Sequence, residues 1–314
     1  MIDNASSDGT ADYLASAWPQ VDCVASSVNL GFAGGNNLGW EEIQRRYPQA
    51  NYVALLNQDT VVQSGWLAAL VAFLEQHPEA GTAQSKLRLH QKPDCFNTVG
   101  NVSHYLGFGF TSACGERDVG QFDEPRLIDF PSGAAFAINV EHLRRWGLFE
   151  AFLFLYLEDT DLGWKLAQLG HPNYYVPTSV VYHKYEFKGD YRNYYFLERN
   201  RHWLLLVYYK WPTLLLLAPA LVLMELGQLV FATQQGVLRA KLRAYGFYLR
   251  PANLAQLWRS RQAAQRRRQI PDRHFLANFT GVIRFEGLQG FLIRRVANPI
   301  FGTYWSVVRR MIWW

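Results

Sequence analysis

The fold class of this chain follows from Tyr52-Val53-Ala54-Leu55-Leu56-Asn57-Gln58-Asp59, in which five apolar residues end in three polar ones. A short apolar run with polar ends is typical of a strand buried on both faces, as in a parallel sheet. Ligands in open α/β sheets bind just beyond the carboxyl ends of the strands. Asn57 and Asp59 are therefore candidate site residues, and a simple turn is the alternative for this triplet.

The segments around this strand alternate between strand-like and helical patterns. Residues 21–24 predict a second strand, and residues 10–18, 37–47 and 66–75 predict helices between strands. Residues 86–130 are rich in Gly, Asn and Ser, which predicts loops or a hairpin crossing over the sheet. The alternation predicts an α/β fold.

Composition limits the class of protein further. The 314 residues are 49% hydrophobic, which is enough for one large domain or two modest ones and is too much for a disordered chain. Cys23, Cys95 and Cys114 are far apart, so we expect neither a zinc site nor a disulfide framework, and a reducing compartment. The first residues do not have the pattern of a signal peptide, so we expect the catalytic part in the cytoplasm.

Charge is distributed unevenly along the chain. Residues 235–314 hold 15 of the 31 Lys and Arg residues but only two of the 26 Asp and Glu residues. A basic, Trp-rich segment suits an anionic membrane surface, and nucleic acid is the alternative partner. We expect the membrane and no nucleic acid, because a strongly apolar stretch precedes the basic one.

That apolar stretch, residues 211–232, is long enough to span a bilayer and carries one charge, Glu225. Pro212, Pro219 and Glu225 count against a membrane span, so a re-entrant or interfacial helical hairpin is an equal alternative. Downstream, Leu238, Leu242, Tyr245 and Leu249 follow one helical face beside several arginines, which predicts an amphipathic helix lying on a surface.

A second cluster of polar residues follows the apolar run 152–157. Glu158, Asp159 and Asp161 come first, and the leucines that follow have the spacing of a helix. The acids are therefore expected at a helix N-terminus, where the helix dipole stabilises negative charge. A plain helix cap is the simpler alternative. A positioned carboxylate is also what general-base activation of a sugar hydroxyl requires.

Two further features are weak when taken alone. His183 ends a short β-like run, and a lone histidine is more often structural than a ligand. The segment 29–37 is a glycine-rich turn before a helix, whose backbone N–H groups can approach a nucleotide. It matches neither the dinucleotide-binding nor the P-loop pattern.

In this order, the motifs resemble those of the family 2 glycosyltransferases, in particular the rhamnosyltransferase-like branch, over residues 1 to about 205. The matching segments are Ile2-Asp3-Asn4-Ala5-Ser6-Ser7-Asp8-Gly9-Thr10, residues 29–39, Leu56-Asn57-Gln58-Asp59-Thr60, Ser132-Gly133-Ala134, Leu157-Glu158-Asp159-Thr160-Asp161-Leu162, Val181-Tyr182-His183 and Glu198-Arg199-Asn200-Arg201. Two departures stand out. The DxD position reads Asn-Gln-Asp, and the strand and helix that open the family's domain are absent before Asp3. We therefore expect an upstream start or a fragment with an exposed strand edge.

The resemblance implies a GT-A fold with a Rossmann-like, mostly parallel sheet over residues 1–202. Residues 203–314 would form a hydrophobic and basic helical region associated with the membrane. It also implies a nucleoside-diphosphate sugar donor, a divalent metal, Mg²⁺ or Mn²⁺, and inversion at the anomeric carbon.

The same resemblance implies roles for individual residues. Asp59 and His183 would bind the metal, and Asp159 would be the catalytic base, with Glu158 and Asp161 orienting the acceptor or the base. The predicted nucleotide-contacting residues are Asp3, Asn4, Gly31, Asn37 and Asn57, with Arg199 or Arg201 reaching the diphosphate.

The expected function is transfer of a deoxyhexose, possibly rhamnose from dTDP-rhamnose, to a cell-surface glycan or lipid-linked acceptor at the cytoplasmic face of the membrane. This would be a step in cell-wall or polysaccharide biosynthesis. A glucosyl-, galactosyl- or mannosyltransferase is one alternative. A truncated, non-catalytic protein that binds glycan, nucleotide or membrane is another. A metal-dependent hydrolase would need more ligands than Asp59 and His183 provide.

Overall fold

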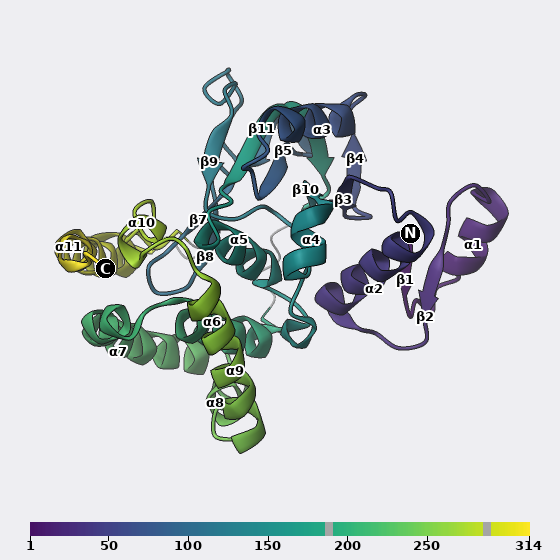
Figure 1. Ribbon diagram of the computed structural model, residues 1–314. Coiled ribbons are helices and arrows are strands. Elements are labelled where there is room, and N and C mark those ends of the chain that lie inside the picture. Colours follow the sequence, from purple (N-terminus) through teal and green to yellow (C-terminus); the bar gives the residue numbers. More distant parts are fainter. Residues whose placement is uncertain (186–190, 285–289) are drawn as a thin grey trace.

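A seven-stranded sheet lies at the centre of the computed structural model, which describes residues 1–185, 191–284 and 290–314 (Figure 1). Its strand order is β3-β10-β5-β11-β4, with β6 beside β5 and β9 beside β11. The strands are β3 (Tyr52–Leu56), β4 (Thr60–Val62), β5 (Thr82–Leu89), β6 (Lys92–Thr98), β9 (Arg126–Ile128), β10 (Ala135–Asn139) and β11 (Asn173–His183).

The prediction of a mostly parallel sheet is wrong. Within the described sheet, β5 and β11 pair in parallel, whereas β10 lies antiparallel between β3 and β5, and β4 and β9 run antiparallel to β11. The prediction that β3 is buried on both faces is also wrong, because only Val53 and Leu55 are buried and Leu56 is 44% exposed. An apolar run carries no information about the direction of the neighbouring strand. The predicted hairpin after residue 86 is confirmed by β5 with β6 and by β7 (Asn101–Ser103) with β8 (Gly109–Thr111).

The first strand does not join this sheet. β1 (Ile2–Asn4) and β2 (Val24–Ser26) form a separate parallel pair, which lies with α1 (Thr10–Ala17) at one side of the molecule (Figure 1). Among the described strands, β3 pairs with β10 alone, so its other edge has no strand partner. The long helix α2 (Gly31–Arg46) links the two parts, because its Ala33 and Trp40 pack with Val53 and Leu55 of β3.

Helices cover both faces of the sheet. α2, α4 (Val140–Trp146) and α5 (Glu158–Gln168) pack with β3 and β10 on one face. α3 (Trp66–Gln76) covers the other face, where its Leu70 and Leu74 meet Ala83 and Val176. A short 3₁₀ turn, η1 (Ala151–Leu153), precedes α5. These arrangements place the start of α5 close to the ends of β3 and β10.

The C-terminal region is helical and shares a core with the catalytic part. Tyr105 and Trp164 are buried in the same cluster as Trp203 and Trp305, and the Tyr105 and Trp305 rings stack 4.7 Å apart. Helix α6 crosses the predicted boundary at residue 202. The remaining elements are α6 (Tyr194–Tyr208), α7 (Trp211–Gln234), α8 (Leu238–Phe247), α9 (Pro251–Arg267), α10 (Asp272–Phe275), the π-helix η2 (Ile293–Ala297) and α11 (Asn298–Met311).

Candidate active site

Asp59 and His183 meet because β4 pairs with the end of β11. His183 stands opposite Thr60 in this antiparallel ladder, so the residue before Thr60 lies beside the histidine. The Nε2 atom of His183 is 3.4 Å from Oδ1 of Asp59. The other ring nitrogen, Nδ1, is 2.9 Å from Oδ1 of the buried Asn97 on β6. The structure thus brings together the two residues that the sequence proposed as metal ligands.

The chemistry of this pair fits a divalent metal. Oδ1 of Asp59 is a buried oxygen with no hydrogen-bond partner among the described residues. Burial lowers the pKa of His183, so the imidazole is neutral. Because the Asn97 amide oxygen can only accept, Nδ1 carries the proton and Nε2 directs its lone pair toward Asp59. A carboxylate oxygen and an oriented imidazole nitrogen are suitable metal ligands.

Asp159 lies in the first turn of α5, half-buried. Its Oδ2 accepts a hydrogen bond from the backbone N–H of Gly133 at 3.2 Å, and its Oδ1 accepts one from Thr160 N at 2.7 Å. Burial raises the pKa of Asp159 to about 6, while these hydrogen bonds oppose the rise. Such a carboxylate is ionised at neutral pH and still basic enough to accept a proton.

Gly133 also connects the two halves of the site. It precedes Ala134, whose carbonyl accepts from the backbone N–H of Asn57 at 2.9 Å. The end of β3, the start of β10 and the start of α5 therefore meet within one short chain of backbone contacts. A Cβ on residue 133 would lie 3.1 Å from the Phe32 ring, so glycine suits this crowded position.

The loop before the acids holds an unusual backbone. Phe154, Tyr156 and Leu157 all have positive φ, between 65° and 68°, although none is glycine. Each such residue costs roughly 1–2 kcal/mol, and strain of this kind gathers at functional sites. Asn200 of α6 holds the loop, because its Nδ2 lies within 3.1 Å of three backbone carbonyl oxygens. The carbonyls belong to Leu153, Leu155 and Tyr156.

The other two acids of the cluster face elsewhere. Asp161 is buried, and its Oδ1 accepts a hydrogen bond from the Tyr208 hydroxyl at 2.8 Å. It lines a cavity of about 120 Å³ between α5 and α9, together with Lys165 and Arg268. Residues 159 and 161 lie about 200° apart around a helix, so they cannot share a face. The predicted role of Asp161 at the acceptor is therefore corrected to a contact with α6.

Glu158 is buried as well, and its Oε2 has no hydrogen-bond partner among the described residues. Burial and the neighbouring charge of Asp159 raise the pKa of Glu158 well above its ordinary value. This shift favours the protonated form of Glu158, in which the carboxyl group can donate a hydrogen bond.

Most of the predicted nucleotide-binding residues have internal partners. Asp3 is buried and accepts from the backbone N–H of Ser6. The Asn4 side chain accepts from Leu30 N and donates to the Gly31 carbonyl, which fixes the glycine-rich segment. This segment forms the first turn of α2 rather than the open turn predicted. A Cβ on Gly31, whose φ is +71°, would lie 2.4 Å from the Phe154 carbonyl oxygen.

Asn37 and Asn57 also differ in their surroundings. The Asn37 amide makes two hydrogen bonds to the backbone of Phe149. It donates to the carbonyl at 2.8 Å and accepts from the N–H at 3.1 Å. In the structure Asn37 therefore links α2 to the segment that precedes η1. The backbone of Asn57 binds Ala134 and the Thr60 hydroxyl, at the metal-site end of β3.

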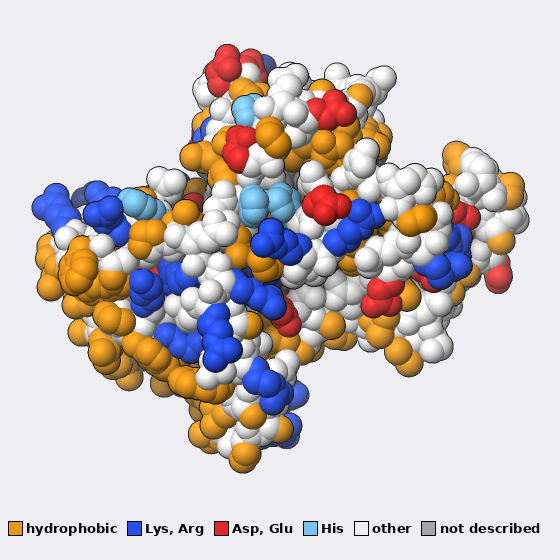
Figure 2. Space-filling view, in the orientation of Figure 1, with side chains coloured by type: hydrophobic (Ala, Val, Ile, Leu, Met, Phe, Trp, Pro, Cys, Tyr) orange, Lys and Arg blue, Asp and Glu red, His pale blue; other side chains and the backbone are white. Residues whose placement is uncertain are grey.

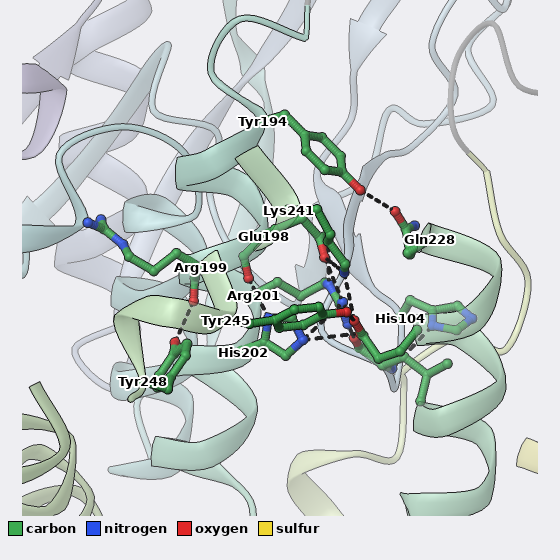
Figure 3. Close-up of polar contacts among 12 residues, drawn as sticks. His104, Tyr194, Glu198, Arg199, Arg201, His202, Gln228, Lys241, Tyr245 and Tyr248 are labelled. Atoms are coloured by element: carbon green, nitrogen blue, oxygen red, sulfur yellow. Dashed lines mark hydrogen bonds and ion pairs between the residues drawn. The ribbon is translucent and has the colours of Figure 1, made fainter. Parts of the chain in front are cut away.

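Arg199 and Arg201 do not reach the site as predicted. Arg199 donates to the carbonyls of Phe152 and Leu153. Arg201 is fully buried and pairs with both Glu198 of α6 and Glu225 of α7. Lys241 of α8 pairs with the same two carboxylates, and these side chains converge in Figure 3. A diphosphate would have to break this buried network.

We call Glu198, Arg201, Glu225 and Lys241 the buried ion network. Glu198, Glu225 and His202 have ligand atoms close enough together to hold a metal ion. However, both carboxylates are already neutralised by Arg201 and Lys241, and Tyr245 also donates to Glu225. Two positive and two negative side chains balance, so this cluster stabilises the packing of three helices.

Sequence reasoning missed three residues that organise the site: Asn97, Gly133 and Asn200. Gly133 and Asn200 stand in the matched family segments, but nothing local shows which carboxylate or carbonyls they contact. Asn97 lies in the loop-rich stretch and gave no signal, because its pairing with His183 depends on β6 joining the sheet.

The sheet flanked by helices, with acids beyond its strand ends, has the architecture of the GT-A fold. The chain belongs to the family described as Glycosyltransferase like family 2, which matches residues 4–203. It is 24% identical over 203 residues to N-acetylglucosaminyl-diphospho-decaprenol L-rhamnosyltransferase of two Mycobacterium tuberculosis strains, CDC 1551 / Oshkosh and ATCC 25618 / H37Rv. The match covers 58% of this chain and 65% of those relatives' length.

A solved structure supports the fold. GalNAc-T7 with UDP, GalNAc and Mn²⁺ superposes with a TM-score of 0.51 at 15% identity, covering 67% of this chain and 41% of that one. The mannosyltransferase PcManGT of Pyrobaculum calidifontis, with GDP-Man and Mn²⁺, has a TM-score of 0.45 at 15% identity, over 99% of this chain and 75% of that one.

Proposed function

We propose that this glycosyltransferase transfers rhamnose, with inversion, from dTDP-rhamnose to a lipid-linked glycan acceptor. The observation that carries the catalytic part is the Asp159 carboxylate, held by Gly133 N–H at the strained start of α5. The name of the Mycobacterium tuberculosis relatives, an L-rhamnosyltransferase acting on a diphospho-decaprenol glycan, supports the donor sugar and the acceptor class.

The residues of this chain divide the reaction between them. Asp159 accepts the proton of the acceptor hydroxyl as that oxygen forms a bond to the anomeric carbon. The bond from that carbon to the diphosphate oxygen breaks on the opposite side, which inverts the configuration. Gly133 and Thr160 fix the direction of the carboxylate, and Asn200 fixes the loop before it.

Asp59 and His183 would hold a divalent cation, Mg²⁺ or Mn²⁺. When bound, such an ion neutralises charge on the departing diphosphate. Asn97 keeps the His183 imidazole in the tautomer that presents Nε2 to the metal. Glu158 precedes Asp159 in the chain, and burial and the charge of Asp159 raise its pKa, which favours a protonated carboxyl group that can donate a hydrogen bond.

The proposed place of action is the cytoplasmic face of the cell membrane, where a lipid-linked acceptor is anchored. The supporting observation is the basic, apolar helical region that follows the catalytic part. Of the 31 large hydrophobic side chains that are exposed among the described residues, 18 lie in this region. A role in building a cell-surface polysaccharide is part of the same proposal.

The test is turnover of a panel of dTDP-, UDP- and GDP-sugars by the full chain with Mg²⁺ or Mn²⁺, scored by nucleoside diphosphate release and by the anomeric configuration of the product. We expect dTDP-rhamnose to be preferred. Asp159→Asn should lower the rate about 10²- to 10⁴-fold, as loss of a general base does. Turnover of none of these donors would instead support the non-catalytic binding protein.

A matched control separates chemistry from packing. Asp161→Asn removes a carboxylate two residues away that contacts Tyr208 instead. It should retain most of the activity. The wild-type rate should rise with pH through about 6, because Asp159 must be deprotonated to act. Equal losses in the two variants would contradict the assignment of the base.

A further inference from the structure

Helix α7 is long and apolar enough to cross a membrane, by length and composition. Its exposed residues, however, lie on a single face. Leu215, Val222, Leu226 and Val230 are between 56% and 74% exposed. Their spacing of seven, four and four residues keeps them within a narrow stripe of the helix surface.

The opposite face of α7 is bound to protein. Leu217, Ala220 and Met224 are buried in the cluster that also contains Trp203. Glu225 lies outside the exposed stripe and belongs to the buried ion network, which joins α7 to α6 and α8. One face of α7 is therefore apolar and exposed, and the opposite face is packed against the rest of the domain.

This attachment decides against a membrane span. The 24 residues of α7 measure about 36 Å, and Glu225 lies roughly 21 Å from its start. In a bilayer with a hydrocarbon core of about 30 Å, a spanning α7 would carry Glu225 into the hydrocarbon. Arg201 and Lys241 would follow, and so would α6, whose Asn200 holds the loop of the active site. Helices of this polarity do not enter a bilayer without a large energetic cost.

A second apolar stripe lies beside the first. Ile300, Val307 and Met311 are between 48% and 56% exposed along one face of α11. Tyr304, on that face, donates its hydroxyl to the Leu216 carbonyl of α7, so the two stripes flank one helix contact. Figure 2 shows hydrophobic side chains gathered along the edge formed by α7 and α11. We call Leu215, Val222, Leu226, Val230, Ile300, Val307 and Met311 the docking face.

The charge around the docking face has one sign. Arg309 and Arg310 are exposed on α11, and Arg239 and Arg243 on α8. Among the described residues after 202, Glu225 and Asp272 are the acids, and both are paired within the protein. Figure 2 shows Lys and Arg side chains over the face beside this edge. An apolar stripe flanked by the exposed arginines of the described helices complements an anionic lipid surface.

We propose that the docking face lies in the plane of an anionic membrane surface, so that α7 rests on the bilayer without crossing it. Its purpose, bringing the site to a lipid-linked acceptor, rests on the proposed function, whereas the binding itself does not. The stripes insert among the headgroups and upper acyl chains, and the arginines contact lipid phosphates.

Vesicle flotation with the full chain tests the binding. The protein should float with phosphatidylcholine vesicles that contain phosphatidylglycerol, and far less with phosphatidylcholine alone. Leu215→Glu should weaken binding about tenfold, because a charge replaces an inserted apolar group. Val119→Glu is the matched control, since Val119 is 76% exposed and Leu215 is 74% exposed, but Val119 lies in the catalytic part. Equal effects of both substitutions, or retention on DNA instead of vesicles, would overturn the proposal.

Thiol labelling tests the orientation of α7. In a background where Cys23, Cys95 and Cys114 are serine, Lys210→Cys and Gln235→Cys mark the two ends of the helix. In sealed inverted membrane vesicles, an impermeant maleimide should label both positions. Labelling of one end alone would mean that α7 spans the bilayer. Sugar transfer to a water-soluble acceptor should persist in Leu215→Glu, so a failure of docking is distinguishable from a failure of the proposed function.

Discussion

The start of α5 and the buried ion network are both crowded with buried charges, but they are built differently. At the start of α5, three carboxyl groups lie close together, and Glu158 and Asp161 each have an oxygen without a hydrogen-bond partner in the described chain. The backbone before them is strained. In the network, two carboxylates are matched by Arg201 and Lys241, with Tyr245 adding a further hydrogen bond.

The difference distinguishes a catalytic region, the start of α5, from a structural one, the buried ion network. Unmatched acids and positive φ angles cost stability, so they persist where a reaction needs a carboxylate of raised pKa. In the buried ion network every carboxylate is already paired with a cation, so the network does not need a ligand. Its ion pairs hold α6, α7 and α8 together. The geometric resemblance of Glu198, His202 and Glu225 to a metal site is therefore misleading, whereas Asp59 and His183 have no competing cation among the described residues.

The sharpest way to break the comparison is Arg201→Met. It removes one of the two cations that neutralise Glu198 and Glu225, and removing one partner of a buried ion pair typically costs about 3–5 kcal/mol. Urea unfolding measures this change. Arg144→Met is the control, because its pair with Glu141 is exposed and should contribute about 0–1 kcal/mol. A similar small effect in both variants would mean that the network does not hold the helices together.

A second test addresses the orientation of the metal ligand. Asn97→Leu removes the acceptor that fixes His183, and losing such a partner typically lowers metal affinity about 10- to 100-fold. Binding of Mn²⁺, followed by paramagnetic resonance as well as by activity, measures it. Thr98→Val is the control, since the adjacent Thr98 side chain binds the Gly100 carbonyl and not His183. Unchanged Mn²⁺ affinity in Asn97→Leu would count against the site.

The strained loop offers a third test. Asn200→Ala removes the NH2 group whose two hydrogens are shared among the carbonyls of Leu153, Leu155 and Tyr156, at about 1 kcal/mol per hydrogen bond lost. We expect kcat to fall about tenfold with little change in KM for the donor, because Asp159 loses its fixed position. Asn253→Ala, which removes one bond to the Phe247 carbonyl, is the control. A rise in KM alone would assign Asn200 to substrate binding instead.

The smallest expected effect concerns pH and stability. Burial raises the pKa of Asp161 to about 7, above its unfolded value, so the folded state binds the proton more tightly. The stability that this proton contributes is complete below about pH 4 and is lost as pH rises through 7. Asp161→Asn cannot ionise, and it should be more stable relative to wild type at pH 8 than at pH 5, by about 2–3 kcal/mol. The same difference in urea midpoint between Asp161→Asn and wild type at both pH values would contradict this.

The local sequence pattern predicted the helices and strands better than it predicted which elements pack against each other. The helices near residues 10, 66 and 158 are confirmed, as is the helix that begins at Leu238. The helix predicted from residue 37 starts earlier, at Gly31, because Asn4 and Phe154 hold the glycine-rich segment in its first turn. That contact joins residues far apart in the sequence, so no local signal announces it.

The sequence by itself determined the α/β class, the family, and the acids and histidine that end strands or begin a helix, because these depend on periodicity and spacing along the chain. The tertiary structure decided the direction of the strands beside β10 and which way each acid faces. Asp159 and Asp161 have the same chemistry, but one meets Gly133 and the other Tyr208. The structure also turned Arg201 from a diphosphate ligand into part of a buried network. The partner of a polar group depends on contacts between distant residues, and these exist only in the folded chain.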